Sequence, residues 1–167
     1  GLGDVYKRQL LTFLISDISF FPDYLNTWTN YILLSKRMTD ILKELQVYFE
    51  LHKVKLIDNK GNELDHPYSL FNLLEIQDAI DKERSIIDDK NIKIIKIVIK
   101  DSIIALAKPM FRFIDHPGFI AVHHNLVNTL KSNQITGCEY IPMDQFQVGT
   151  EFDMPCVDEL IKRHNKL

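Results

Sequence analysis

Cysteine is scarce in this sequence, which has only Cys138 and Cys156 among its 167 residues. Two thiols cannot build the disulfide framework of a small secreted protein, and no Cys-x-x-Cys or Cys/His spacing indicates a zinc site. We therefore expect two reduced thiols, no metal or other cofactor, and a cytoplasmic location.

Long hydrophobic runs and an excess of basic residues are also lacking. The apolar stretch 10–15 is far shorter than the ~20 residues that a membrane helix needs. Lys and Arg number 20 against 23 Asp and Glu, a formal net charge of -3, whereas a chain that grips nucleic acid clusters Lys and Arg. The sequence predicts no membrane span and no nucleic-acid partner.

The first nine residues do not look native. Residues 4–9 read DVYKRQ, which resembles the translation of a transposon-end adapter used in preparing sequencing libraries, and such a scar is excluded from a fold. An ordinary polar tail is the alternative. On the first interpretation, residues 10–167 form a single domain with one core, truncated at an N-terminus that lies upstream of Leu10.

The clearest local pattern predicts a helix after Ser35. Apolar residues from Met38 to Leu45 recur at i, i+3, i+4 and i+7, which places them on one helical face. The Ser35 hydroxyl is suited to capping the first turn. Residues 47–56 and 68–74 have strand patterns, joined to one another through a turn at 58–62.

Two later segments also predict strands. Residues 92–99 are apolar on both faces and β-branched almost throughout, which is typical of a central strand. Residues 103–113 predict another strand, bent or ended near Pro109. Residues 156–163 have the pattern of a short terminal helix.

The first strand–helix unit recurs at a constant offset of 88 residues. The matched pairs are Tyr31–Leu34 with Phe119–Val122, Ser35 with His123, and Lys43 with Lys131. A strand pattern follows each helix, at 49–51 and at 138–141. We predict a repeated strand–helix–strand unit, with chance similarity as the alternative. The fold class is then α+β, a mainly antiparallel sheet with two or three packed helices.

Several of these segments together resemble a bacterial polymorphic-toxin immunity family, long known only as a domain of unknown function. The segments are Leu34-Ser35, Tyr68-x-Leu70-x-Asn72-x-Leu74, Asp78-Ala79-x-Asp81-x-Glu83-x-Ser85, Phe111-Arg112-Phe113, Phe119-Ile120-x-Val122 and Thr136-Gly137-Cys138-Glu139-Tyr140. The likeness spans residues 17–146. It departs from the family at His123-His124, where Ser or Thr is usual, and at Tyr140, where Phe is usual.

The resemblance implies a protein that binds and neutralises a cognate protein toxin and is not an enzyme. No catalytic residue accompanies the family's motifs. Its structural motif residues in this chain are Ser35, Tyr68, Asn72, Asp81, Ser85, Arg112 and Gly137. The alternatives are a small enzyme that uses His123, His124 or Cys138, and a regulatory domain of a larger protein.

The residues that invite an enzymatic interpretation have simpler ones. His123 and His124 are adjacent on a helix and point about 100° apart, so they do not form a metal-binding pair. We expect solvated imidazoles at a helix N-terminus. Cys138 could pair with either imidazole, but its place in a strand pattern favours a small buried thiol.

Partner-binding candidates are acidic or aromatic. Asp78, Glu83, Asp88 and Asp89 could face a basic cleft on a toxin, where complementary charge speeds association. A solvated turn is the alternative, with Asp81 and Ser85 as local caps. Tyr24 and Trp28 are candidate interface anchors, and core burial is the alternative for both. Arg112 either pairs with the acidic turn or faces solvent, and Asn72 needs hydrogen-bond partners if its strand is an inner one.

Overall fold

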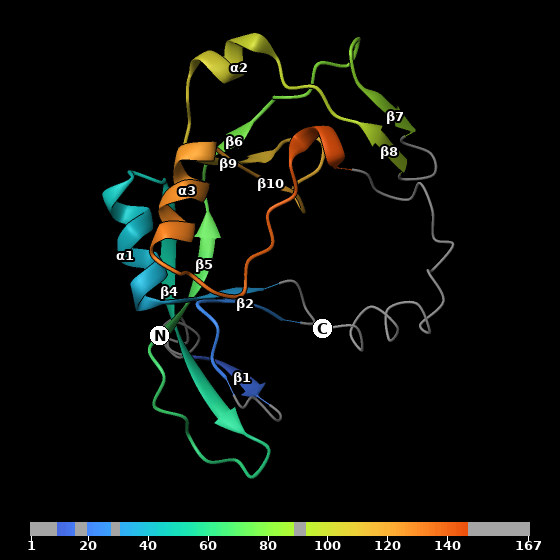
Figure 1. Ribbon diagram of the computed structural model, residues 1–167. Helices are drawn as coiled ribbons and strands as arrows, with labels where there is room; N and C mark the ends of the chain where they lie inside the picture. The colour runs from blue at the N-terminus through green and yellow to red at the C-terminus, as the bar shows by residue number, and fades with distance from the viewer. Residues whose placement is uncertain (1–9, 16–19, 28–30, 89–92, 147–167) are drawn as a thin grey trace, which may run out of the picture. The chain divides into compact units, whose positions relative to one another are not determined.

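The computed structural model describes residues 10–15, 20–27, 31–88 and 93–146, which leaves the adapter-like residues outside (Figure 1). The strands within these ranges are β1 (Leu11–Ile15), β2 (Tyr24–Asn26), β3 (Ile32–Ser35), β4 (Phe49–Asp58), β5 (Tyr68–Leu73), β6 (Ile76–Gln77), β7 (Ile86–Asp88), β8 (Lys93–Lys96), β9 (Met110–Phe113) and β10 (Ile120–Val122). The helices are α1 (Lys36–Glu44), α2 (Asp101–Ala105), α3 (His124–Ser132) and a 3-10 turn, η2 (Met143–Gln145).

The chain divides into two compact units. Unit 1 consists of residues 1–78 and 105–139, and unit 2 of residues 79–104 and 140–167. Helices and strands are both present, and among the described strand pairs only β1–β4 and β6–β9 are parallel. The predicted α+β class is therefore confirmed.

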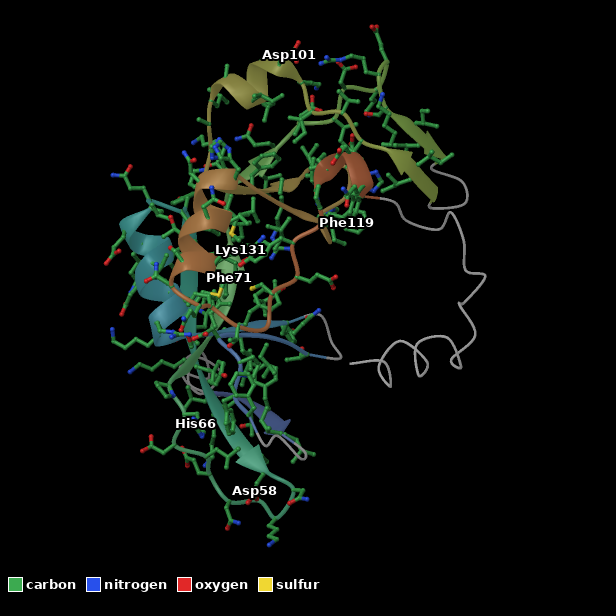
Figure 2. All side chains as sticks on the ribbon, in the orientation of Figure 1. Asp58, His66, Phe71, Asp101, Phe119 and Lys131 are labelled. Atoms are coloured by element: carbon green, nitrogen blue, oxygen red, sulfur yellow. The ribbon has the colours of Figure 1, made fainter. Side chains whose placement is uncertain are left out.

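A five-stranded sheet dominates unit 1, in the order β1-β4-β5-β3-β2. The β1 strand pairs with β4 in parallel, and the other three pairings are antiparallel. The predicted strands at 47–56 and 68–74 are confirmed as β4 and β5. The predicted turn at 58–62 is also present, at the end of β4, where Figure 2 labels Asp58. One oxygen of that carboxylate, Oδ1, accepts the amides of Lys60 and Asn62, each at 2.8 Å.

The core of unit 1 gathers around the inner strand β3, whose Leu33 and Leu34 are 0% and 1% exposed. An inner strand covered on both faces needs apolar side chains on both, which explains the continuous run Ile32-Leu33-Leu34. Burying one such leucine contributes about 1.5–3 kcal/mol. The cluster around Leu33 contains Ile15, Leu56, Tyr68 and Leu70.

The α1 helix begins where the sequence predicts. Ser35 is its N-cap, and the hydroxyl oxygen of Ser35 accepts the Met38 amide at 3.2 Å. The apolar face packs inward, with Met38 and Leu42 at 1% and 0% exposure. The amphipathic spacing alone was therefore sufficient to place this helix.

The first hairpin and helix, β2–β3–α1, recur as β9–β10–α3. Both strand pairs are antiparallel, and α3 begins and ends 88 residues after α1. The N-cap residue of each helix donates its backbone amide to the residue just before the first strand of its hairpin. Ser35 donates to the Asp23 carbonyl at 2.8 Å, and His123 donates to the Pro109 carbonyl at 2.9 Å. The recurring unit is thus a hairpin followed by a helix.

The predicted strand after the second helix is wrong. Residues 138–141 are irregular in the described chain and pair with no strand there. The chain turns at Gly137, which has a φ of 86°, and the preceding residue, Thr136, bonds through its backbone to Asp23 and Tyr24.

The prediction of a central strand over residues 92–99 is also wrong. Only β8 (Lys93–Lys96) forms, and it pairs with β7 alone in a two-stranded sheet. The backbone of Val98 bonds instead to the turn around Asp81 and Ser85. The Val98 carbonyl accepts the Asp81 amide at 2.8 Å, and the Val98 amide donates to Ser85 Oγ at 2.9 Å. The turn overrides the β-branched propensity of this stretch.

Only the end of the predicted strand 103–113 is a strand. Its start belongs to α2, which opens on Asp101, an acidic residue suited to a helix N-terminus. Ala107 has a φ of 48°, a left-handed conformation that ends the helical stretch. The β9 strand then begins at Met110, after Pro109. The predicted terminal helix at 156–163 lies outside the described residues. No helix within the described ranges is long and apolar enough to cross a membrane.

Candidate binding surfaces and the Asp23 cluster

Unit 1 contains a buried carboxylate at Asp23, which is 7% exposed. One carboxylate oxygen, Oδ1, accepts the Ser35 hydroxyl at 2.7 Å and Arg37 Nε at 3.2 Å. The other, Oδ2, accepts Arg37 Nη2 at 2.5 Å. It also accepts the amide and hydroxyl of Thr136, at 3.0 and 3.1 Å. Both oxygens are therefore fully engaged with three residues from two segments of the chain.

These contacts hold Asp23 in its charged form. Burial by itself raises the pKa of the carboxyl group, but the hydrogen bonds from Arg37, Ser35 and Thr136 outweigh it and lower that pKa from 3.8 to about 2. A buried carboxylate whose hydrogen bonds are all satisfied within the protein is typical of a structural group. We assign Asp23 a structural role.

Two other residues of the family-like motifs lie against the same segment. The Tyr68 hydroxyl donates to the Pro22 carbonyl. Burial, and then the negative charge of Asp23, raise the pKa of Tyr68 to about 12. A Cβ on Gly137 would lie 2.1 Å from the Tyr24 carbonyl oxygen, so only glycine fits there. Ser35, Tyr68 and Gly137 thus converge on residues 22–24.

Sequence reasoning missed Asp23, Arg37 and Thr136. A signal for one of them was present, because Arg37 lies in the first turn of a helix that has no acidic residue there. A cation at that end opposes the helix dipole, which points to a carboxylate partner elsewhere. That partner, Asp23, lies 14 residues before Arg37, outside the helix pattern. Thr136 carries no local signal of its role, because it is 113 residues from Asp23.

Unit 2 contains the turn of the central motif. Asp81 Oδ1 accepts the amides of Glu83 and Arg84, at 3.1 and 3.0 Å. Arg84 Nε donates to Asp81 Oδ2 at 2.6 Å, and Arg84 Nη2 donates to Asp101 at 3.1 Å (Figure 2). The hydrogen bond from Arg84 is the main reason that the pKa of Asp81 is lowered. Asp81 therefore caps its own turn, whereas the Ser85 hydroxyl joins that turn to Val98.

The acidic partner-binding candidates are divided between the two units, and one of them is not described. Asp78 is exposed in unit 1, and Glu83 is exposed in unit 2. Asp88 lies on β7, and Asp89 lies outside the described residues. Arg84 compensates two further carboxylates of unit 2, which leaves that turn less acidic than its sequence indicates.

Of the aromatic candidates, Tyr24 lies on the edge strand β2 and is half-buried. Burial is the main reason that the pKa of Tyr24 is raised. Trp28 lies outside the described residues. Tyr24 thus combines partial burial with partial exposure, as interface aromatics often do.

His123 is the N-cap of α3, and its Nδ1 accepts the Asn125 amide at 3.3 Å. His124 is exposed, with its ring centroid 4.3 Å from that of His123. Nδ1 of His123 is thereby occupied in capping rather than free for ligation. Among the described residues, no group of three or more His, Cys, Asp or Glu is arranged to hold a metal ion.

The predicted strand location of Cys138 is wrong, because this half-buried thiol follows Gly137 in irregular chain. Arg112 lies on β9 and donates to the Pro117 carbonyl at 2.8 Å, which closes the loop between β9 and β10. Asn72 lies on the inner strand β5, opposite Glu50, and is exposed. Solvent can therefore satisfy its amide.

The described polar groups cap helices, close loops and hold segments of an α+β protein together. Comparison with protein families shows that the model of the immunity protein family Imm11 matches residues 4–145. The match covers most of the chain, and the protein belongs to this immunity protein family. No curated protein matches the chain.

Proposed function

We propose that this protein neutralises a cognate bacterial toxin by binding it, without catalysis. The membership in an immunity protein family over residues 4–145 carries the proposal. The geometry of the candidate catalytic groups supports it, because His123 is engaged as a helix cap. The mechanism is stoichiometric occlusion of the toxin, with an interface on the order of 1,600 Å² in total.

The proposed interface includes exposed acidic residues. Asp78 and Glu83 carry exposed carboxylates, and complementary charge on a basic toxin surface would speed encounter. Tyr24, Trp28, Asp88 and Asp89 complete the set of proposed contacts. The toxin is expected to be encoded beside this gene.

The decisive experiment is co-expression with the toxin encoded next to this gene. Growth rescue is expected from the unaltered chain and from His123→Ser, His124→Ala and Cys138→Ala. Serine is chosen at position 123 because it keeps a helix cap. If one of these variants fails to rescue growth although circular dichroism shows that it is folded, protection requires the substituted side chain, and the proposal of binding without catalysis is contradicted.

A second arm tests the interface with the purified toxin. Glu83→Lys is expected to slow association about tenfold, with a smaller effect at high salt. Glu44→Lys, which makes the same charge change on the exposed side of α1, is the matched control and should associate at the unaltered rate. Equal rates for both variants would place the interface elsewhere.

A further inference from the structure

Residues 134–137, here called the strap, lie along the edge strand β2. The Thr136 carbonyl accepts the Tyr24 amide at 3.0 Å, and Thr136 Oγ1 accepts the Asp23 amide at 3.1 Å. The β2 strand is the last in the sheet order, so its outer side has no strand partner among the described residues. The strap takes the place of that partner.

Polar contacts to one carboxylate hold the strap. Asp23 Oδ2 accepts both the amide and the hydroxyl of Thr136. Arg37 Nη2, which pairs with Asp23, also donates to the Gln134 carbonyl at 3.0 Å. The charge on Asp23 therefore fixes the strap at two points, directly and through Arg37.

The repeat shows that this arrangement is not a requirement of the hairpin–helix unit. Pro109 occupies the backbone position in the second copy that Asp23 occupies in the first, because each carbonyl accepts the amide of the N-cap residue. Asn125 corresponds to Arg37 at the 88-residue offset. The second unit forms its hairpin and helix without the carboxylate and without the guanidinium, so these groups serve the strap rather than the unit.

We propose that Asp23 is a latch that holds the strap closed over the outer edge of β2, and that loss of its charge opens the strap while the rest of unit 1 stays folded. An open strap exposes the Tyr24 amide on a strand edge, which is a template for pairing with a strand of another chain. The closed strap thus blocks such pairing.

The test follows amide hydrogen exchange by NMR, residue by residue, in the full chain without toxin, so its outcome is independent of the proposed immunity function. Asp23→Asn keeps the shape of the side chain and removes its charge. We expect the amides of Tyr24 and Thr136 to exchange about tenfold faster or more, while the Ile41 and Leu42 amides of α1 keep their rates. Asp40→Asn, on an exposed carboxylate of α1, is the control and should leave all four amides unchanged.

A second variant keeps the test decisive if Asp23→Asn does not fold. Thr136→Val removes the hydroxyl that bonds both the amide and the carboxylate of Asp23, and it should give the same local pattern with a smaller increase. Unchanged exchange at Tyr24 would overturn the latch. Equal acceleration throughout unit 1 would also overturn it, since Asp23 would then support the whole unit and not the strap.

Discussion

Gln46 and Gln134 lie 88 residues apart and share a left-handed backbone conformation, with φ of 57° and 53°. Each follows the C-cap residue of a helix, Leu45 after α1 and Asn133 after α3. The two turns close with the same hydrogen bonds. The matching pairs are Gln46 to Lys43 with Gln134 to Lys131, and Val47 to Leu42 with Ile135 to Leu130.

This pattern is a Schellman turn, which usually places glycine at the left-handed position. Both copies use glutamine there instead. Identical helix lengths, matched N-caps and the same departure from glycine are more than a common strand–helix unit requires. The two hairpin–helix units therefore share their helix lengths and their turns, and the Asp23 contacts distinguish the first unit from the second.

Replacing either glutamine with glycine should stabilise the protein. A residue with a Cβ in the left-handed conformation destabilises the folded state by about 1–2 kcal/mol, and glycine removes this strain. Glycine also raises the conformational entropy of the unfolded chain, which offsets part of the stabilisation. We expect Gln46→Gly and Gln134→Gly each to raise the free energy of unfolding by about 0.5–1 kcal/mol in urea titrations. Lys43→Gly, within α1, is the control and should lower it by about 1 kcal/mol. A loss of stability in both Gln variants would show that their side chains hold the turns.

The α3 helix should gain stability from a better cap. The His123 imidazole accepts the Asn125 amide at 3.3 Å, a long bond for a cap. His123→Ser should add about 0.5–1 kcal/mol to the free energy of unfolding, measured by chemical denaturation. Ser35→His is the reciprocal change and should cost more than His123→Ser gains, because Ser35 Oγ also donates to Asp23. Equal and opposite effects would mean that the Ser35–Asp23 hydrogen bond contributes nothing to the free energy of unfolding.

Local patterns were enough to predict part of this fold. The face from Met38 to Leu45 and the cap at Ser35 predict α1 within one residue of its observed end. The 88-residue offset predicts where α3 begins. In these cases the signal lies within one turn of helix or one strand, where spacing and hydrogen-bonding capacity determine the structure.

The remaining features depend on contacts that local patterns do not contain. Residues 92–99 have strong β propensity, yet the turn at Asp81 and Ser85 takes the backbone groups of Val98. The Asp23 cluster depends on Thr136, which is 113 residues away in sequence. Long-range partners decided each of these outcomes.

Acid should weaken the protein through Asp23. Because the folded-state pKa of Asp23 is about 2, below the usual 3.8, the carboxylate stabilises the fold fully above pH 3.8 and loses this effect as pH falls toward 2. The difference between the two pKa values corresponds to a loss of roughly 2 kcal/mol in the free energy of unfolding. Unfolding curves at pH 5 and pH 2.5 should therefore differ less for Asp23→Asn than for the unaltered protein. An unchanged difference would mean that other carboxylates account for the acid sensitivity.

Two glycines with nearly the same backbone conformation should respond very differently to alanine. Gly137 and Gly61 have φ of 86° and 83°. A Cβ on Gly61 meets nothing within 4 Å, whereas a Cβ on Gly137 would lie 2.1 Å from the Tyr24 carbonyl oxygen. Gly61→Ala should cost about 1 kcal/mol from backbone strain alone. Gly137→Ala should cost at least about 2 kcal/mol more, because the strap must move off β2. Thermal unfolding of the two variants measures the difference, and equal melting temperatures would show that the strap accommodates a side chain at little cost.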